Sequence, residues 1–244
     1  VLRNGRPLAM TWLAERAPAV LEAWMLGVEA GPAVADVLFG KYSPGGRLPA
    51  AFPRASGAVP FYYAAYPTGR PPDPDLAKDT ARYMDQPITP LFAFGHGLSY
   101  TRFEYSDFAL DRERVAADET LQVSVTVRNV GEMTGDEVVQ LYVRDPVASV
   151  ARPVRELRGF KRVTLSPGEA VRVSFRLSPR QLALYGLDER WRVEAGRIEV
   201  MIGASSADIR AQGAFEIVNT AETDVPATAL ATEVSVERRT VHRR

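Results

Sequence analysis

Apolar and polar residues alternate along much of the second half of the chain, from about residue 108 to residue 218. Because successive side chains of a β-strand point to opposite faces, a period of two predicts strands with one buried face. Pairs such as Pro167-Gly168 and Ala195-Gly196 mark turns between the runs. We therefore expect about seven short strands over roughly 110 residues, the pattern of an all-β immunoglobulin-like sandwich. The alternating apolar positions are Leu121, Val123, Val125, Val127, Val171, Val173, Phe175, Leu177, Trp191, Val193, Ile198, Val200, Ile202, Phe215 and Ile217.

The first fifty residues follow a different pattern, in which short apolar runs flank one predicted helix. Residues 19–26 ("AVLEAWML") form a compact apolar run that favours a buried strand, although periodicity alone leaves a helix open. Residues 29–40 predict a helix, because Pro32 suits the first turn and Gly40 suits the position after the last turn. With the apolar pair Val1 and Leu2, which reads as the end of a strand, this is an α/β pattern.

These elements divide the chain into four predicted parts. Two strands and one helix are too few to cover both faces of a parallel sheet, so residues 1–54 are interpreted as the C-terminal part of an α/β sandwich domain that begins upstream. Residues 55–104 concentrate Pro, Gly and Tyr, which predicts a wrapping linker. Residues 105–218 form the predicted sandwich. Residues 219–244, where alternation fades, are predicted to be a flexible C-terminal tail.

Charge and composition narrow the class of protein. Thirty Lys and Arg balance thirty Asp and Glu, so no net field attracts nucleic acid or a membrane surface, and we expect neither as a partner. No apolar run approaches the roughly 20 residues of a membrane helix, and no secretory leader opens the sequence. The absence of cysteine excludes a disulfide framework and thiolate metal sites. We expect no cofactor and no metal site.

Histidine chemistry has few candidates, because the chain holds only His96 and His242. His242 lies in the predicted tail. His96 stands between Gly95 and Gly97, which favours a tight turn over catalysis, and neither histidine has a partner at metal-ligand spacing. The stretch "SPGGR" (43–47) resembles a phosphate loop only through its glycines, since the lysine and hydroxyl residue of such a loop are absent.

Carboxylates and aromatic side chains offer two routes to sugar chemistry. Two carboxylates roughly 5 to 10 Å apart can hydrolyse a glycosidic bond, and the α/β segment contains Glu22, Glu29 and Asp36. Structural roles, such as a carboxylate near a helix N-terminus, account for Glu29 and Asp36 better than catalysis does. Aromatic faces can stack on sugar rings or pack in a core, and both uses stay open for a group of four residues. This group is Trp24, Tyr62, Tyr63 and Tyr66.

Several segments, taken in order, resemble the C-terminal part of glycoside hydrolase family 3, in particular its bacterial β-glucosidase type. They include "EAWMLGVEAGPAVADVLFGKYSPGGRLPAAFP" (22–53), "RYMDQPITPLFAFGHGLSYTRFEYS" (82–106) and "ELRGFKRVTLSPGE" (156–169). The resemblance covers about residues 1–218. It implies a barrel domain with an Asp nucleophile and, on a loop of the following α/β sandwich domain, a Glu acid/base, both upstream of Val1. It also implies a fibronectin type III-like domain in the predicted sandwich. No residue here matches either catalytic motif, so the resemblance implies no catalytic residue in this chain.

The same resemblance gives a role to "FGHGLSY" (94–100), which is similar to the family's Phe-Gly-x-Gly-Leu-Ser-Tyr signature at the junction of the two domains. We expect its glycines to form a turn. We also expect Phe92, Phe94, Leu98 and Tyr100 to hold the junction together by burying apolar surface. The order "SPGGR" departs from the family's usual Pro-Ser-Gly-Arg, which leaves the turn intact.

The leading hypothesis is that the chain is the C-terminal fragment of a retaining, exo-acting β-glycosidase, with β-glucosidase favoured. The intact enzyme would hydrolyse terminal non-reducing sugars of a β-glucoside or oligosaccharide, with the missing N-terminal barrel domain as its partner in cis, and this fragment would be structural. The alternative is a free-standing fibronectin type III-like adhesion or carbohydrate-binding module, because sandwich folds host many functions. Family relatives are often periplasmic or secreted, which favours such a compartment.

Overall fold

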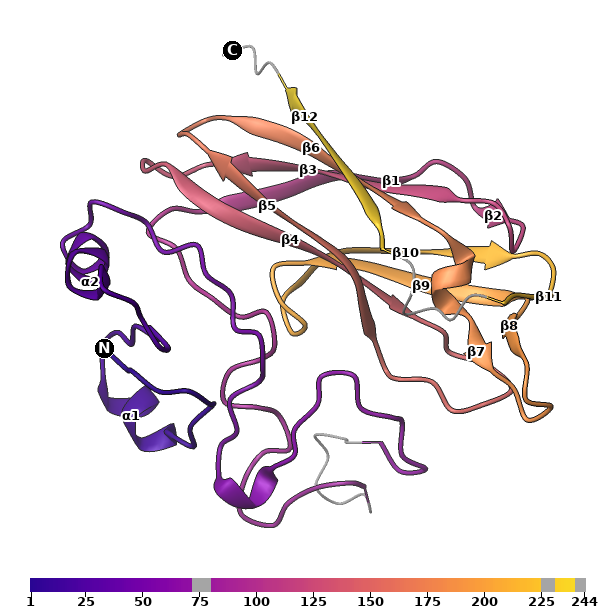
Figure 1. Cartoon of the computed structure of the whole chain (residues 1–244), viewed down its shortest axis with the longest axis horizontal. Helices are drawn as coiled ribbons and strands as arrows, with labels where there is room; N and C mark the ends of the chain where they lie inside the picture. Colours follow the sequence, from indigo (N-terminus) through magenta and orange to yellow (C-terminus); the bar gives the residue numbers. More distant parts are fainter. Residues whose placement is uncertain (72–79, 225–230, 240–244) are drawn as a thin grey trace.

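The structure is a computed structural model that describes residues 1–71, 80–224 and 231–239. Two sheets face each other to form a β-sandwich, and a small third sheet lies at one end (Figure 1). The first sheet has the order β1 (Phe103–Leu110), β3 (Leu121–Asn129), β6 (Ala170–Leu177) and β12 (Glu233–Arg239). The second has the order β2 (Arg114–Val115), β10 (Ile209–Ile217), β9 (Gly196–Gly203), β4 (Gly135–Arg144) and β5 (Glu156–Leu165). The third joins β11 (Ala221–Glu222), β8 (Trp191–Val193) and β7 (Leu184–Tyr185).

The core of the sandwich consists of the inward-facing apolar side chains that the alternating pattern predicted. Val125 and Val173 are directly opposite each other in the register of β3 and β6, and both are fully buried. Val200 and Ile202 of β9 are buried from the facing sheet. Since burying one such side chain stabilises a protein by about 1.5–3 kcal/mol, this core explains why the alternating residues form strands. The predicted all-β sandwich is confirmed.

Strand β4 lacks clear alternation in the sequence, and the structure gives the reason. Nine of its ten residues are buried. Val139, Leu141 and Val143 point into the core of the sandwich, whereas Gln140 and Tyr142, also buried, face the other way. A strand covered on both faces has no solvent-exposed face to carry polar residues. What covers the outer face of β4 is the polypeptide that precedes the sandwich.

The N-terminal segment, residues 1–54, contains two short helices, α1 (Thr11–Arg16) and α2 (Ala30–Leu38). The predicted helix is confirmed as α2, and Gly40 follows it with a positive φ of 75°. Helix α1 was not predicted. The expected strand over residues 19–26 is wrong within the described residues, because its only pairing is one parallel bridge between Leu2 and Glu22. A strand needs a longer ladder of neighbours than this single contact provides.

The linker, residues 55–104, has little regular structure in its described part. It contains a single 3-10 turn, η1 (Ser56–Ala58), among the described residues, and then runs back along the sandwich. A second such turn, η2 (Pro179–Leu182), follows β6 inside the sandwich domain. The linker and the N-terminal segment lie together on one side of the sandwich (Figure 1). No helix among the described residues is long and apolar enough to cross a lipid bilayer.

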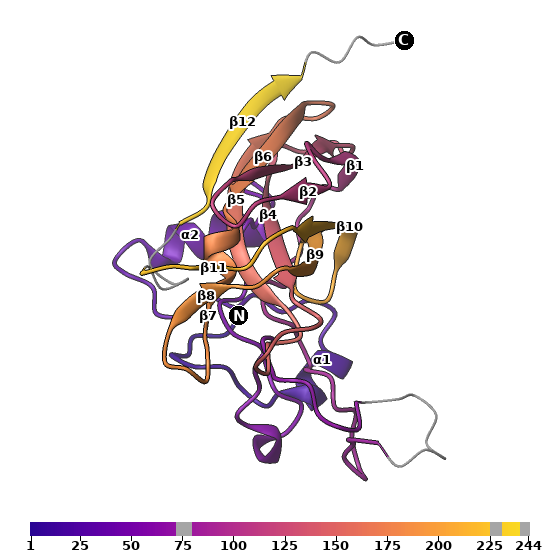
Figure 2. The same ribbon diagram turned by 90° about the vertical axis from the view of Figure 1, so that its right-hand side faces the viewer.

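The prediction of a flexible tail over residues 219–244 is wrong for residues 233–239. These residues form β12, which pairs with residues 170–176 of β6 and runs along the side of the sandwich (Figure 2). Thr232, just before β12, accepts a hydrogen bond from the Gln181 side chain at 2.8 Å and donates one to the carbonyl of Arg158. The alternation in β12 is short, because it spans only residues 233–237 before two arginines, and Val234 is the one residue of the strand that is not exposed. His242 lies outside the described residues, and the other predicted domain boundaries stay predictions.

Candidate functional site: a polar seam between the N-terminal segment and the sandwich

The structure brings two stretches of irregular chain, residues 42–52 and residues 92–101, together against the sandwich. The two stretches are hydrogen-bonded to each other, since the amide of Leu48 donates to the carbonyl of His96 at 2.9 Å and the amide of Gly95 donates to the carbonyl of Leu48 at 2.8 Å. Phe52 and Phe92 form an isolated antiparallel bridge next to them. We call this contact region, with the β4 side chains beneath it, the seam.

A buried ion pair crosses the seam. Arg47 Nη2 lies 2.9 Å from Glu137 Oε2, and the two side chains are only 9% and 5% exposed. The second oxygen of Glu137, Oε1, accepts a hydrogen bond from the Tyr105 hydroxyl at 3.0 Å. Burial, and then the neighbouring Glu137 carboxylate, raise the pKa of Tyr105 well above its ordinary value, so this hydroxyl stays a donor. Both Glu137 oxygens therefore have partners, as a buried carboxylate requires.

A second carboxylate, Asp136, is bound from both sides of the seam. Its Oδ2 accepts from the Tyr42 hydroxyl at 3.0 Å, and its Oδ1 accepts from the Thr164 hydroxyl at 2.7 Å. Its hydrogen bond to Tyr42, helped by burial, raises the pKa of that tyrosine. Arg162, which lies 3.8 Å from Asp136, donates to the carbonyl of Gly45 at 3.0 Å. A Cβ at Gly45 would overlap Asp136, so the glycine is needed for this close approach.

The glycine before His96 makes a third polar contact with β4. Gly95 has a φ of +80° and is buried against Gln140, whose amide nitrogen donates to the carbonyl of Gly95 at 3.3 Å. The same amide donates to the carbonyl of Ala204 at 2.6 Å, and its oxygen accepts from the Tyr142 hydroxyl. One glutamine side chain of β4 thus connects the turn of the linker with Ala204, the residue that follows β9.

Aromatic rings fill the space beside these polar contacts. Tyr63 stacks on Phe94 with ring centroids 4.2 Å apart and meets the edge of Tyr142 at 6.0 Å. Trp24 packs on Phe52 at 5.9 Å. For Trp24 and Tyr63 the structure favours packing over sugar stacking. The other two aromatic candidates, Tyr62 and Tyr66, are 68% and 63% exposed.

The predicted junction is present, but its apolar side chains contribute less than expected. Phe92 and Phe94 are partly buried in aromatic contacts. Leu98 is 75% exposed, so the prediction that it is buried at the junction is wrong. Tyr100 is 51% exposed and contributes polar contacts instead, because its hydroxyl donates to the carbonyl of Val37 in α2 at 2.9 Å. Here the backbone itself makes the close contact, since a Cβ at Gly97 would overlap the carbonyl of Gly46.

The three candidate carboxylates each have a local role in the structure. Glu22 accepts a hydrogen bond from the backbone amide of Trp24 at 2.9 Å. Glu29 occupies the position before α2, without a side-chain cap. Asp36 pairs with Lys41 at 3.2 Å on the surface. Within the described part of the chain, no group of three or more His, Asp or Glu side chains is placed to hold a metal ion.

The seam residues Arg47, Asp136 and Glu137 were not identified from the sequence. One available signal was the "SPGGR" stretch, whose glycines match no phosphate loop and instead allow close approach to the sandwich. Another was the pair of acidic residues that opens the apolar run of β4, since carboxylates in a buried strand need partners. Neither signal names the partner, which comes from about 90 residues away in the sequence for both Arg47 and Tyr42.

We predict that the seam weakens in mild acid through His96. This side chain is partly buried and stacks on Phe92 at 5.3 Å. Burial, and then the positive charge of Arg47, lower its pKa from the ordinary value of 6.5. The unfolded chain therefore binds a proton more readily than the folded chain. The stability that His96 contributes is complete above pH 6.5 and is lost as the pH falls below that value toward its lower folded-state pKa.

The measurement is the free energy of unfolding in urea between pH 5 and pH 7.5, for the natural chain and for His96→Gln. The variant cannot titrate in this range, so its stability should depend less on pH. Parallel pH curves for the two proteins would contradict the prediction.

Two family models match this chain, one in its N-terminal part and one in its C-terminal part. Residues 1–100 match the glycosyl hydrolase family 3 C-terminal domain, and residues 137–206 match the fibronectin type III-like domain. A periplasmic β-glucosidase of Salmonella typhimurium is 44% identical over 219 residues, which cover 89% of this chain and 28% of that protein. A β-xylosidase of Formosa agariphila is 48% identical, over 84% of this chain and 28% of its own length.

Solved structures of β-glucosidases also resemble this chain. The crystal structure of a β-glucosidase from Listeria innocua in complex with glucose superimposes with a TM-score of 0.85 at 37% identity, over 89% of this chain and 30% of that one. This chain thus spans less than a third of the length of these relatives.

Proposed function

Because this chain belongs to glycoside hydrolase family 3, of which it spans the C-terminal portion, we propose that it supports a retaining, exo-acting β-glycosidase, with β-glucosidase as the favoured activity. The whole enzyme would cleave the terminal non-reducing sugar of a β-glucoside or oligosaccharide. The chain's own role in this proposal is structural: it completes the α/β domain and braces that domain with the sandwich.

The seam is the observation that carries the structural role. A buried ion pair and the buried side chain of Asp136 connect the N-terminal segment to β4 of the sandwich, and the buried side chain of Gln140 connects the linker to the same strand. Displacing one partner of such a contact leaves a buried polar group unpaired, which costs free energy. The contacts therefore favour one fixed arrangement of the N-terminal segment on the sandwich. A rigid brace would hold the active-site loops of an α/β domain in a fixed position relative to a neighbouring catalytic barrel.

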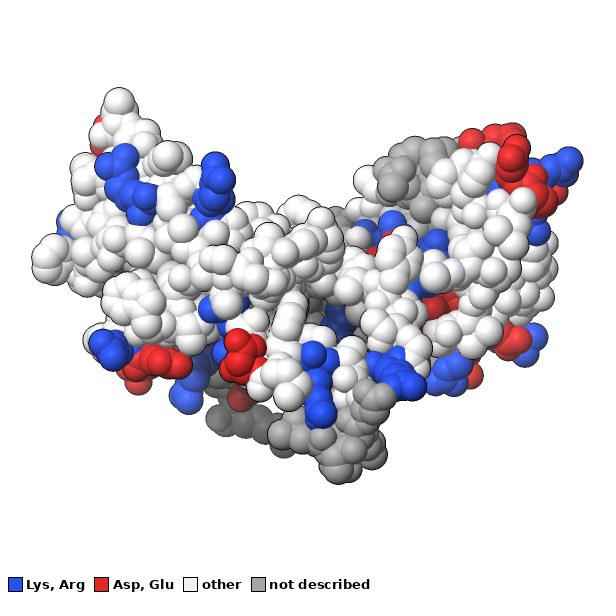
Figure 3. Space-filling model, turned by 90° about the horizontal axis from the view of Figure 1, so that it is seen from below, with Lys and Arg blue, Asp and Glu red and all other residues white. Residues whose placement is uncertain are grey.

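Exposed apolar side chains in the N-terminal segment support a partner domain in cis. Val28 is 98% exposed, Phe39 83%, Met25 74% and Trp12 64%. Much of this part of the molecule, on the left in Figure 3, is uncharged surface. Large exposed apolar side chains gathered in one segment favour a protein contact over free solvent. We propose that these side chains pack against the preceding part of the α/β domain and against the N-terminal barrel domain.

The test joins this chain to the polypeptide encoded immediately upstream and measures hydrolysis of aryl β-D-glucoside and aryl β-D-xyloside. The proposal expects turnover of at least one substrate, with retention of the anomeric configuration. Absence of turnover by a folded protein that contains both parts would refute it. The alternative of a free-standing adhesion or binding module has no support from the relatives, which are named as glycosidases.

A further inference from the structure

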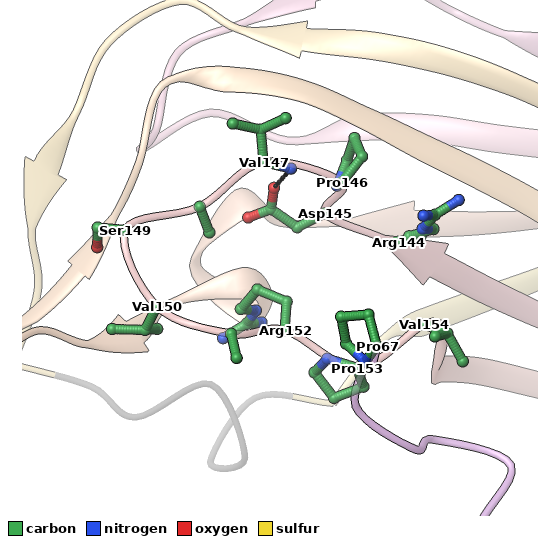
Figure 4. Close-up of a pocket in the computed structure, with 12 residues that line it drawn as sticks. Pro67, Arg144, Asp145, Pro146, Val147, Ser149, Val150, Arg152, Pro153 and Val154 are labelled. Carbon is green, nitrogen blue, oxygen red and sulfur yellow. Dashed lines mark hydrogen bonds between the residues drawn. The ribbon is translucent and has the colours of Figure 1, made fainter. Parts of the chain in front are cut away.

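The loop of residues 145–155, which connects β4 to β5, closes around a hollow of about 370 Å³ (Figure 4). The loop is fixed at two points. The amide and the hydroxyl of Ser149 both donate to the Glu194 carboxylate, and the amide of Val154 donates to the carbonyl of Ala65 in the linker at 2.9 Å. Pro67 of the linker closes one side of the hollow. A loop held in this way keeps its shape without a ligand, and loops held by a rigid scaffold commonly carry binding sites.

Three charged side chains, Arg144, Asp145 and Arg152, line the hollow, and Figure 4 shows Asp145 and Arg152 within the ring of the loop on opposite sides. Arg144 pairs with Glu199 at 3.4 Å. Arg152 is 12% exposed and pairs with Glu156 at 3.0 Å, but its Nε is buried without a hydrogen-bond partner in the described structure. Asp145 accepts one weak hydrogen bond, 3.3 Å from the amide of Val147, through Oδ1. Burial raises the pKa of Asp145, as expected for a carboxylate that lacks full solvation. The Asp145 carboxylate therefore has acceptor capacity to spare, whereas the unpartnered Nε of Arg152 has no accessible surface in the hollow.

Ser149 adds a hydroxyl to the lining, and the apolar part comes mainly from Pro146, Val147, Val150 and Pro153. The volume is within the range of small-molecule sites, which combine apolar walls with a few polar groups. Each arginine already pairs with a carboxylate, so Asp145 would repel a free anion, and the two arginines would repel a metal ion. A neutral polyol suits these groups, because one ring hydroxyl can donate to the Asp145 carboxylate while its neighbour accepts from an arginine guanidinium. The C–H surface of the ring can then contact the proline and valine side chains.

We propose that this hollow, the 145–155 site, binds a single pyranose unit of a neutral glycan. The choice of sugar as the ligand class rests on the proposed glycosidase function, whereas the site itself rests on the geometry of the loop. Its role would be to hold the sandwich end of the enzyme near a glycan that also carries the substrate. The affinity expected of so small a ligand is weak, with a Kd on the order of 1 mM.

The experiment titrates the full 244-residue chain, labelled with ¹⁵N, with methyl β-D-glucopyranoside and methyl β-D-xylopyranoside. The proposal expects saturable shifts of backbone amide signals in residues 145–155 with at least one sugar. Asp145→Asn should weaken binding at least fivefold. Asp118→Asn makes the same chemical change at an exposed residue away from the hollow and should leave binding unchanged.

Val150→Phe, which fills the hollow, is the second variant in case Asp145→Asn disturbs the loop, and it should abolish the shifts. Absence of saturable shifts in the folded natural chain would overturn the proposal, as would equal binding by Asp145→Asn and Asp118→Asn. This outcome is separate from the hydrolysis test. A joined enzyme that hydrolyses glucosides while this chain binds no sugar refutes only the 145–155 site, and binding without any hydrolysis refutes only the glycosidase function.

Discussion

Glu137→Ala is expected to lower the free energy of unfolding by about 3–5 kcal/mol, the loss typical of breaking a buried ion pair from one side. The substitution would leave the Arg47 guanidinium, 9% exposed, without its carboxylate. It would also remove the acceptor of the Tyr105 hydroxyl. The measurement is urea unfolding followed by circular dichroism, with the slope compared between variants to check that the same surface unfolds.

The chain offers a matched control for this loss. Arg114 and Glu216 form an ion pair with the same distance of 2.9 Å, but their side chains are 68% and 50% exposed. Glu216→Ala should therefore change stability by no more than about 1 kcal/mol. The double variant Arg47→Met/Glu137→Leu should lose less than Glu137→Ala, because no unpaired charge stays buried. Equal losses for Glu137→Ala and Glu216→Ala would mean that the ion pair of the seam is not buried in solution.

Gly95→Ala is the second substitution with a large expected effect, a loss of about 2–5 kcal/mol. Roughly 1–2 kcal/mol comes from placing a Cβ on a residue with a φ of +80°. About 1–3 kcal/mol more is expected because the new Cβ overlaps the Gln140 amide and would displace it from its buried hydrogen bonds. Thermal unfolding of the natural chain and the variant gives the comparison.

Gly40→Ala separates these two causes. Gly40 has a similar φ of +75°, but no atom lies within 4 Å of the position that its Cβ would take. This variant should show the backbone cost alone, so it should be clearly more stable than Gly95→Ala. If the two variants were equally destabilised, the contact between Gly95 and Gln140 would have no energetic role.

How far the sequence predicts the structure depends on how many faces of an element are exposed. Strands such as β3 and β6 have one polar and one apolar face along part of their length, and their alternation identified them directly. Strand β4 is covered on both faces, so most of its polar residues are buried as well. In β12 the alternation is confined to residues 233–237, and only Val234 is partly buried. The missed strands therefore follow from their positions in the fold and not from unusual local preferences.

In the seam, too, some features could be predicted from the sequence and others could not. The glycines around His96 correctly indicated a tight turn at a junction, because a turn is a local property of the backbone. The partners of Arg47 and Gln140 could not be read from the sequence, since a side chain at a junction meets residues that are distant along the chain. Leu98 was expected to be buried for its apolar character, but Gly97 brings the backbone itself against Gly46, and the leucine side chain remains exposed.

The central claim is that this chain braces a glycosidase and performs no hydrolysis itself. It is tested most directly by incubating the purified, folded 244-residue chain with an aryl β-D-glucoside and measuring release of the aryl group. The account predicts release no faster than in buffer alone. Steady turnover that rises in proportion to the concentration of the chain, and that copurifies with it, would contradict the account.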